Sequence, residues 1–594
     1  MSRRHAPAAN PAEGLERASR IAIVIACVGL ALWTHRRVLG GFFTLDDLLI
    51  LEEMRGIRPH AFTLWRALSG EVYFRAAAAL FGSHPFPYHL VSWLLHGVNV
   101  VLLFALVRRA GGRLATAALA AGLFGTTRLA MTAVHSPASI GELGALGFTI
   151  GAFLVGGDDR IATLRRGGLF TAALLCKESV MLLPLLLLLP LPGAGPLAIR
   201  VRRAAPLLAL SAVVAAGLVF SGAGGTRLGG EAYALGWGEN LLRNLLTYAA
   251  WTVDMRAPIP DQLMIGGPHD LAPARIALVV MLSLALTAWH VTRLPAFGAL
   301  AWLLGIAPVL PFLNHTYLHY LYASCAGAAI ALAGVLEWGS RVLLDRDGAT
   351  VVRRSPRPLV AGSIAIAAAV LVLAHAAVSE RLLGKRETLC LADSKMPLDP
   401  YLRKSEVARR ASDAVGIDLE GQRGRVAFLL PVSIQRFYSV ATGGATDAPP
   451  PGVRRYGLVE GSLDDGRALR ALHSNVDTVA FLDSWQPGFK DYELFGQDSD
   501  GEVFLLGHGA DGFAIAAALL MDGGGLGPAT EMLAGALTES PDNAALRYQN
   551  ARAHYLAGDS LGMQHELEEL VRRAPNHPLA LRLRSGGMVR VVWR

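Results

Sequence analysis

Two adjacent carboxylates, Asp46 and Asp47, follow the first long apolar segment of this chain of 594 residues. A hydroxyl group that attacks an electrophilic carbon needs a base to take its proton, and a carboxylate can supply that base. At a boundary between water and lipid, loss of hydration raises the pKa of a carboxyl and makes it a stronger base. Neighbouring helix residues point in different directions, so we expect only one of the pair to act. The alternative is a capping box, in which Thr44 and Asp47 begin a helix over 46–54.

Other polar residues interrupt apolar sequence and are candidates for binding. Lys177 and Glu178 stand in an apolar stretch, where charges are costly and indicate function, although they also fit a turn at the membrane interface. Arg66 suits bidentate contact with a phosphate, or lies as a solvated arginine on the surface. His89 and His96 lie on one face of a helix about 10 Å apart along its axis, too far for one metal without further ligands. They line a site or pack between helices.

Composition predicts the element type that positions these residues. The chain is 53% apolar and 17% charged, whereas soluble domains carry about 25% charged residues. Repeated apolar runs near the ~20 residues that cross a bilayer predict a polytopic helical membrane protein. The net charge is +8, but the basic residues lie in short loops between spans, where positive charge sets the orientation of the protein in the membrane. We therefore expect no nucleic acid as a partner. The four cysteines have no metal-like spacing.

Apolar runs predict about eleven spans. They lie near 21–34, 89–107, 115–134, 140–156, 168–176, 180–192, 204–221, 275–291, 297–313, 318–337 and 359–378. All arginine clusters fall on one side of the membrane if 168–192 is a hairpin of two short spans that turns at residues 177–179. The tail 1–20 is then cytoplasmic, whereas loops 35–88 and 222–274 are external, and the protein sits in a membrane such as the bacterial inner membrane.

The chain after the transmembrane domain, 21–378, is predicted to be external, and so periplasmic in a bacterium. Strand-like runs and a hairpin predict a small α/β domain over 379–510. Over 511–594 a motif recurs after 34 residues, at Pro541-Asp542-Asn543 and Pro575-Asn576-His577. This period is typical of tetratricopeptide repeats, which offer a surface for a protein partner. Because two repeats bury little core alone, we expect them to dock on the α/β domain.

The order of several short motifs resembles the GT-C glycosyltransferases, above all the transmembrane and tetratricopeptide-repeat-containing O-mannosyltransferases and their bacterial relatives. The resemblance covers roughly residues 20–340. Its motifs are Asp46-Asp47, Trp65-Arg66-Ala67-Leu68, Leu80-Phe81-Gly82, Tyr88-His89-Leu90-Val91, Leu94-Leu95-His96, Cys176-Lys177-Glu178-Ser179, Leu310-Pro311 and Tyr320-Leu321-Tyr322.

The resemblance implies a polyprenyl-phosphate sugar donor, an acceptor outside the cytoplasm and an acidic catalytic base in the first outer loop. A leaving lipid phosphate needs cations near the interface, for which we select Arg66, Lys177 and Arg256. Trp251, Asp254 and Arg256 are candidates to line the acceptor entrance, and His89, His96 and Glu178 are candidates to line the donor or acceptor site. The need for a divalent cation stays open.

The predicted function is therefore an inverting membrane glycosyltransferase that acts on an acceptor hydroxyl at the outer face of the membrane. The acceptor is a protein or a glycan, and a glycolipid or polysaccharide acceptor is the rival enzymatic interpretation. A non-catalytic scaffold or transporter is the alternative from another class. A transporter is expected to show inverted repeats around a midplane site, and the sequence shows no convincing internal symmetry.

Overall fold

The computed structural model describes residues 11–60, 62, 64–220, 234–253, 271–313, 316–344, 358–390, 395–397, 399–430, 458–498 and 500–585. It divides into two compact units. The first, the helical unit, contains Met1–Gly41 and Ala61–Thr388, and the second, the mixed unit, contains Phe42–His60 and Leu389–Arg594. The short acidic segment is thus grouped with the C-terminal part of the chain rather than with the loop 35–88 around it.

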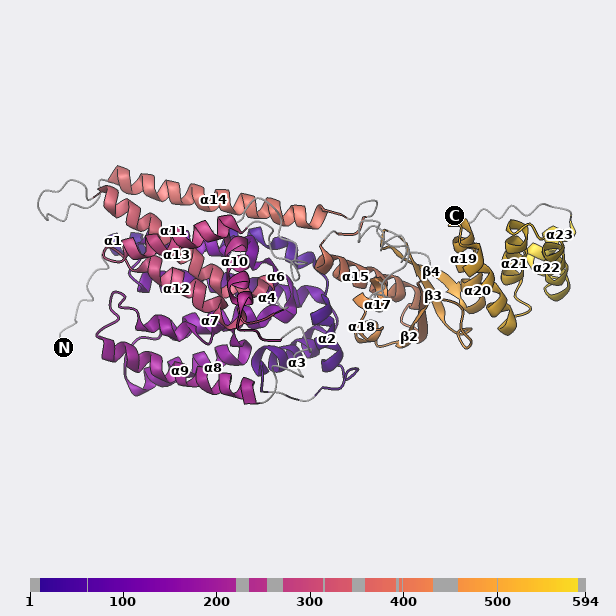
Figure 1. Cartoon of the computed structure of the whole chain (residues 1–594), viewed down its shortest axis with the longest axis horizontal. Coiled ribbons are helices and arrows are strands. Elements are labelled where there is room, and N and C mark those ends of the chain that lie inside the picture. Colours follow the sequence, from indigo (N-terminus) through magenta and orange to yellow (C-terminus); the bar gives the residue numbers. More distant parts are fainter. Residues whose placement is uncertain are drawn as a thin grey trace, which may run out of the picture. The chain divides into compact units, whose positions relative to one another are not determined.

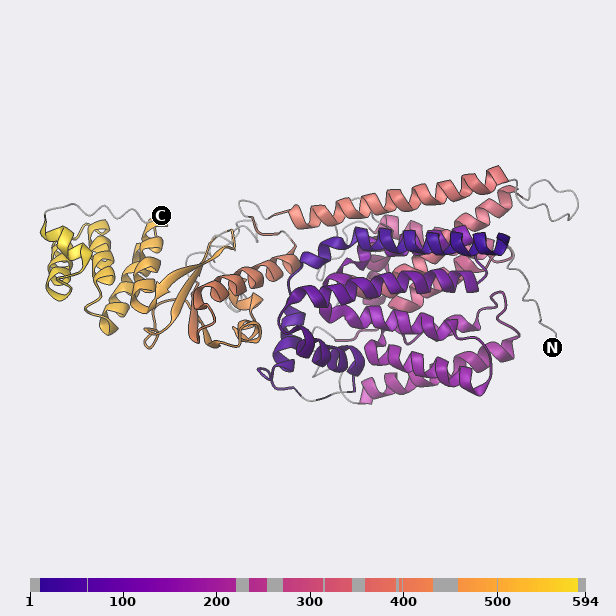
Figure 2. The ribbon, with the colours of Figure 1, turned by 180° about the vertical axis from the view of Figure 1, so that it is seen from behind.

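The helical unit is built from long helices that pack side by side, among them α1 with α4 and α4 with α5 and α7 (Figures 1 and 2). Its α-helices are α1 (Pro11–Thr34), α3 (Tyr73–Phe81), α4 (Pro85–Arg109), α5 (Leu114–Gly125), α6 (Met131–His135), α7 (Ile140–Leu154), α8 (Arg160–Cys176), α9 (Leu197–Phe220), α10 (Glu239–Val253), α11 (Ala272–Ala288), α12 (Leu294–Ile306), α13 (Leu321–Leu344) and α14 (Pro358–Thr388). Short helical turns of other kinds join them: η1 (Arg36–Gly40), η2 (Ala67–Val72), η3 (Arg128–Ala130), η4 (Pro137–Ser139), η5 (Glu178–Val180), η6 (Leu183–Leu188), η9 (Ala307–Val309) and η10 (Leu318–Tyr320).

Among the described residues, five helices are long and apolar enough to cross a membrane. These are Glu16–Thr34, Pro85–Arg109, Pro137–Leu154, Leu318–Val342 and Gly362–Thr388, and a bent pair from Leu114 to His135 makes a sixth if it counts as one span. The apolar helices Glu178–Leu188, Ala272–Ala288 and Leu294–Val309 are shorter. A membrane protein with five or six candidate spans is therefore supported, and the count of about eleven stays a prediction.

Two features of the sequence explain how these helices pack and end. Glycines bring α12 and α13 close together: a Cβ at Gly298 would lie 2.2 Å from the backbone nitrogen of Ala331, and one at Gly327 would lie 2.3 Å from that of Trp302. Small residues of this kind allow close approach of helices in membranes. The predicted interruption within 168–192 is present, because α8 ends at Cys176 and Lys177 is extended, with φ −161° and ψ 137°.

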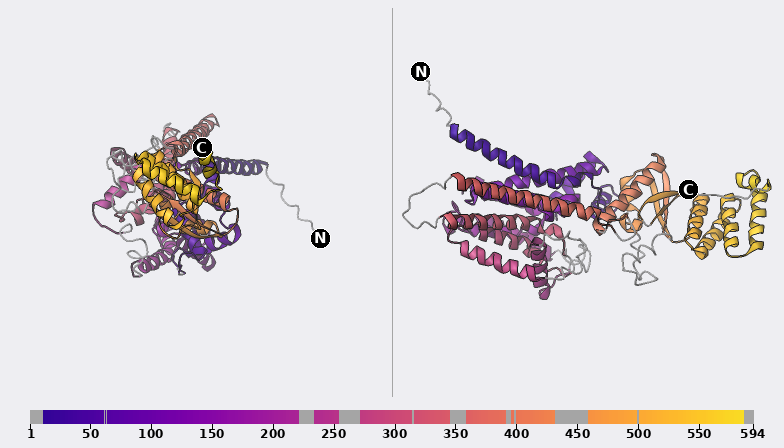
Figure 3. Two further views of the ribbon diagram at one scale, coloured as in Figure 1. Left: turned by 90° about the vertical axis from the view of Figure 1, so that its right-hand side faces the viewer. Right: turned by 90° about the horizontal axis from the view of Figure 1, so that it is seen from above.

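Helix α14 runs along α5 and α1, as the views in Figures 1 and 3 show. Many of its large apolar side chains are exposed, among them Ile366, Val370 and Leu373. In water such a surface costs free energy, whereas facing lipid it does not. The exposed apolar side of α14 therefore agrees with a membrane-spanning helix at the edge of the bundle.

The mixed unit holds a four-stranded sheet in the order β2-β1-β3-β4. Strand β1 (Gly424–Leu429) pairs in parallel with β2 (Val476–Leu482) and β3 (Glu493–Gln497), and β3 pairs antiparallel with β4 (Val503–His508). The predicted strands and the predicted hairpin are present. The helices of this unit are α2 (Leu45–Met54), α15 (Pro400–Leu419), α17 (Leu458–Ser462), α18 (Arg467–Leu472), α19 (Gly509–Asp522), α20 (Leu526–Glu539), α21 (Ala544–Leu556), α22 (Ser560–Arg573) and α23 (Pro578–Arg584).

The C-terminal helices share a core with the sheet. Leu429, Leu494 and Leu506 of the strands pack with Phe513 of α19 and Leu546 of α21 in one buried cluster. The expected docking of the helices on the α/β domain is therefore present. Successive helices pack against one another, α19 with α20, α20 with α21 and α21 with α22. Their identity as tetratricopeptide repeats stays a prediction.

Candidate functional site

The structure separates the roles of the two adjacent carboxylates in the mixed unit. Asp47 is fully buried, and its Oδ2 accepts hydrogen bonds from the backbone N–H and the hydroxyl of Thr44, both at 2.7 Å. Thr44 precedes the first residue of α2, so this is the capping box weighed above. The hydroxyl of Tyr401 in α15 donates to Thr44 Oγ1 at 3.1 Å. Asp47 therefore fixes the start of α2.

Asp46 differs from its neighbour in exposure and surroundings. Its side chain is exposed to solvent, one residue before the buried Asp47. It interacts electrostatically with Lys404 of α15, which is half-buried. Burial lowers the pKa of Lys404, whereas Asp46 raises it and the adjacent Arg403 lowers it. Of the two carboxylates, Asp46 is the one that is accessible from solvent.

A second carboxylate pair lies at the other end of α2. Glu52 is completely buried, and Arg58 binds it through Nε at 3.2 Å while a terminal nitrogen of the same guanidinium binds Asp464. One cation thus serves two carboxylates. Burial, together with Asp464, raises the pKa of Glu52 to about 8, against the opposing effect of Arg58. This cluster ties α2 to the turn before α18, where Asp464 has a left-handed φ of 47°.

In the helical unit the predicted cation Arg66 forms an ion pair with the predicted site residue Glu178. Arg66 Nε lies 3.1 Å from Glu178 Oε2, and a terminal nitrogen lies 2.6 Å from Oε1, so the contact is bidentate. Burial opposes ionisation of Glu178, but Arg66 and Lys177 lower the pKa of its carboxyl to about 2. Arg66 adopts a left-handed φ of 53°, which is strained for a residue other than glycine. The fork therefore holds a defined geometry.

Lys177 belongs to the same charged network. Its Nζ lies 3.2 Å from Oε1 of Glu142 in α7, and both side chains are nearly buried. The hydroxyl of Ser179 donates to Oε2 of Glu142 at 2.9 Å. Lys177 also lies over the ring of Tyr320, 5.5 Å from its centroid. Arg66, Glu178, Lys177 and Glu142 form a chain of alternating charge, in which the two cations already face carboxylates.

The two predicted histidines lie in α4, buried between helices. The Nε2 of His96 donates to the carbonyl of Gly125 at 3.0 Å, so Nδ1 accepts from the hydroxyl of Tyr322 at 2.9 Å. Both ring nitrogens of His96 are thus used, which favours its packing role. The ring of His89 lies against the chain at Gly41, where a Cβ would come within 3.2 Å of it. His89 is also within electrostatic reach of His135.

The remaining predicted residues lie near the end of α10. Trp251 is buried in the core of the helical unit, where its ring meets that of Tyr248 edge-on at 5.5 Å. Asp254 and Arg256 lie outside the described residues. The structure thus describes Arg66, Lys177, Glu178, His89, His96 and Trp251 in the helical unit, and Asp46 and Asp47 in the mixed unit.

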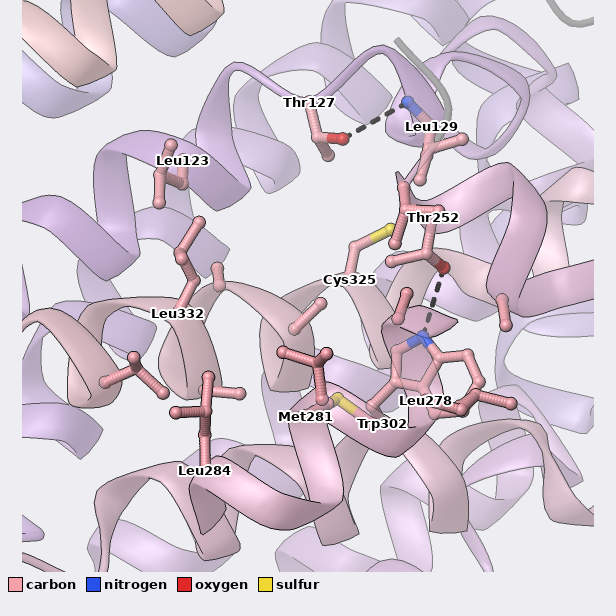
Figure 4. Close-up of a pocket in the computed structure, with 18 of the residues that line it drawn as sticks. Leu123, Thr127, Leu129, Thr252, Leu278, Met281, Leu284, Trp302, Cys325 and Leu332 are labelled. Carbon is pink, nitrogen blue, oxygen red and sulfur yellow. Dashed lines mark hydrogen bonds between the residues drawn. The ribbon is translucent and has the colours of Figure 1, made fainter. Parts of the chain in front are cut away.

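An apolar cavity of about 470 Å³ lies in the helical unit (Figure 4). Its wall is mostly aliphatic, with Leu278, Met281 and Leu284 of α11 and Leu332 of α13 among the residues labelled. Polar groups line part of it: the indole N–H of Trp302 donates to Thr252 at 3.1 Å, and Thr127, Cys325 and His375 are also present. A volume of this size is typical of sites for small molecules or parts of larger ones.

Sequence reasoning missed several residues that the structure brings to these places. Glu142 is a single acid in an apolar helix, and this isolation was a signal that it has a partner. Buried Arg128 lies within electrostatic reach of His375 and Cys325 beside the cavity, and buried Arg386 lies near His135. In the part of the chain that is described, no three His, Cys, Asp or Glu side chains are grouped to hold a metal ion. The need for a divalent cation stays untested.

Comparison with known proteins adds a distant likeness. No family description matches the chain, and no curated protein matches it by sequence. Among solved structures, the chain is similar to the crystal structure of the oligosaccharyltransferase of Archaeoglobus fulgidus, tethered by a disulfide bond to an acceptor peptide with the NVT sequon. The identity is 11%, the alignment covers 77% of this chain and 71% of the other, and the TM-score is 0.38. A likeness this weak does not assign an activity.

Proposed function

We propose that this protein is an inverting membrane glycosyltransferase of the GT-C type, which moves a sugar from a polyprenyl-phosphate carrier to an acceptor hydroxyl at the outer face of the membrane. The observation that carries the proposal is the difference in burial between the two adjacent carboxylates of α2. Asp47 is buried in the capping box, and the adjacent Asp46 is exposed. A rigid helix start that presents one accessible carboxylate is compatible with a catalytic base.

In this mechanism Asp46 takes the proton of the acceptor hydroxyl as its oxygen attacks the anomeric carbon of the donor. The bond between that carbon and the carrier phosphate breaks, and the phosphate leaves with the electron pair. Attack from the face opposite the leaving group inverts the anomeric centre. Asp47 does not reach the acceptor and serves to hold α2.

The phosphate that leaves carries negative charge, and Arg66 and Lys177 remain the cations proposed to stabilise it, together with Arg256 outside the described residues. Both described cations already contact carboxylates, Arg66 at 2.6 Å and Lys177 at 3.2 Å. A phosphate therefore has to share these cations with Glu178 and Glu142. Only a group with at least one anionic hydrogen-bond acceptor competes with these carboxylates, so the network is selective for such groups. The cavity of about 470 Å³ is a suitable place for part of an apolar carrier chain.

The test is a comparison of Asp46→Asn with Asp47→Asn in the purified full-length protein, with a polyprenyl-phosphate sugar as donor. Asp46→Asn is expected to abolish transfer without a change in thermal stability, since the side chain is exposed. Asp47→Asn is expected to destabilise α2 by about 1 kcal/mol through its cap and to retain measurable transfer. Full transfer by Asp46→Asn contradicts the proposal.

A partner-binding role for the C-terminal helices is the second candidate, compatible with the first. At the junction of α21 and α22, Tyr555 is 68% exposed and Leu561 is 81% exposed. Exposed large apolar residues close together in sequence are typical of surfaces that bind proteins. A protein acceptor or a non-catalytic partner fits this surface. Tyr555→Ala with Leu561→Ala is expected to weaken binding of such a partner while leaving transfer to a small soluble acceptor unchanged.

A further inference from the structure

Helix α15 contacts the acidic segment at successive points along one face. The hydroxyl of Ser405 donates to the carbonyl of Phe42 at 3.2 Å, and the hydroxyl of Tyr401 donates to Thr44 Oγ1 at 3.1 Å. Lys404 interacts electrostatically with Asp46. Positions 404 and 405 lie three and four residues after 401, so both neighbour Tyr401 on one side of the helix. That side of α15 lies against residues 42–46.

Several groups in the hydrogen-bonded contacts are shielded from water. Thr44 is 4% exposed, Asp47 is fully buried and Ser405 is 8% exposed. The hydroxyl of Tyr401 donates to Thr44, and Thr44 donates to Asp47, so a chain of hydrogen bonds runs from α15 to the first turn of α2. In a site of low dielectric constant such a chain is stronger than in water and fixes one arrangement.

The charges around Asp46 are mixed. Asp47 is its neighbour on α2, Lys404 of α15 interacts with it electrostatically, and Arg403 is adjacent to Lys404. Arg403 is in turn within electrostatic reach of Asp399, which caps α15 by accepting from the backbone N–H groups of Tyr401 and Leu402. Asp47 and Arg403 are thus each engaged with other groups. Lys404 is the cation that the structure couples to Asp46.

We propose that Lys404 and Tyr401 are positioning residues for Asp46: Tyr401 holds the start of α2 through Thr44, and the ammonium of Lys404 orients the Asp46 carboxylate. The catalytic consequence of this inference rests on the proposed function. The electrostatic coupling itself does not. The positioning of Asp46 then depends on α15 of the same mixed unit.

The experiment uses the full-length protein in detergent and two readouts. The first is the pH at which Asp46 becomes reactive to a water-soluble carbodiimide, which modifies protonated carboxyls, located by mass spectrometry. In Lys404→Gln this midpoint is expected to move up by at least ~0.5 pH unit, because an opposite charge nearby favours the ionised carboxylate. Lys404→Arg, which keeps the charge, is expected to restore the midpoint. The control Lys395→Gln removes a lysine that pairs with Asp500 at 3.2 Å in the same unit and is expected to leave it unchanged.

The second readout is the pH dependence of transfer, whose acid limb is expected to move by the same amount in Lys404→Gln. An unchanged carbodiimide midpoint in a folded Lys404→Gln protein overturns the inference. If the midpoint shifts in Lys404→Gln but the wild-type protein transfers no sugar, the coupling is supported and the proposed function is contradicted.

Tyr401→Phe covers the case in which Lys404→Gln fails to fold, because it removes a single hydroxyl. It is expected to raise the rate of hydrogen exchange of residues 42–48 about fivefold, which is the change in an opening equilibrium when one hydrogen bond is lost. Unchanged exchange in Tyr401→Phe contradicts the role of this residue.

Discussion

Replacing Glu52 by glutamine is expected to abolish a loss of stability with rising pH in α2, the helix that contains Asp46. Glu52 is fully buried and shares Arg58 with Asp464, and its pKa is raised from 4.5 to about 8. Between these pH values the native protein keeps the proton that the unfolded chain has lost. Stability therefore falls as pH rises through this window, by up to ~1.4 kcal/mol per pH unit and about 5 kcal/mol in all. Glutamine is neutral in both states, so the slope disappears.

Hydrogen exchange of the peptide over 45–54 measures this effect when the two proteins are compared at the same pH. At pH 5 the variant and the wild type are expected to exchange almost equally. The protection of the variant relative to the wild type is then expected to grow by up to ~10-fold per pH unit until about pH 8. Glu531→Gln, an exposed glutamate on α20, is the control for net charge. Equal exchange of Glu52→Gln and wild type at pH 8 refutes the reasoning.

Two further predictions concern the ion pair of Lys177 and the membrane topology. Lys177→Met leaves Glu142 buried without its cation and is expected to lower the free energy of unfolding in detergent by about 3 kcal/mol. Adding Glu142→Gln to Lys177→Met is expected to recover most of this loss. If the losses of the two single variants simply add, the pairing is contradicted. Reporter fusions after residues 60, 250 and 400 are expected to be external and those after 110, 162, 201 and 348 cytoplasmic, and an external signal at 201 contradicts the predicted hairpin.

Local patterns in the sequence were sufficient for several elements of the fold. The charges of Lys177 and Glu178 mark the end of α8, and alternating apolar residues mark the strands of the sheet. The shared core of the strands and C-terminal helices was expected because so few helices bury little core alone. The membrane spans were harder to count. Helices such as Ala272–Ala288 are apolar but too short to be identified as spans by length.

The candidate site depended on contacts that no local pattern encodes. The capping role of Asp47 was one of two interpretations open from the spacing to Thr44, and the structure shows the cap. Asp46 interacts with Lys404, and Glu52 is close to Asp464, which binds the same Arg58. Both Lys404 and Asp464 are hundreds of residues away in the sequence. In the sequence, Lys404 resembles any lysine on the solvated side of an amphipathic helix. Arg66 and Glu178 were both selected, but not as partners, since spacing cannot show that two distant charges meet.

The contact between Tyr401 and Thr44 joins residues 357 positions apart, and it has a consequence for how the protein is made. At about 5–20 residues per second of synthesis, the start of α2 waits roughly 20–70 s for α15 to leave the ribosome. During that interval the first candidate span is complete, but Asp46 lacks the helix that holds it. A chain that stops before residue 389 therefore lacks the α15 partner of Thr44 at the start of α2.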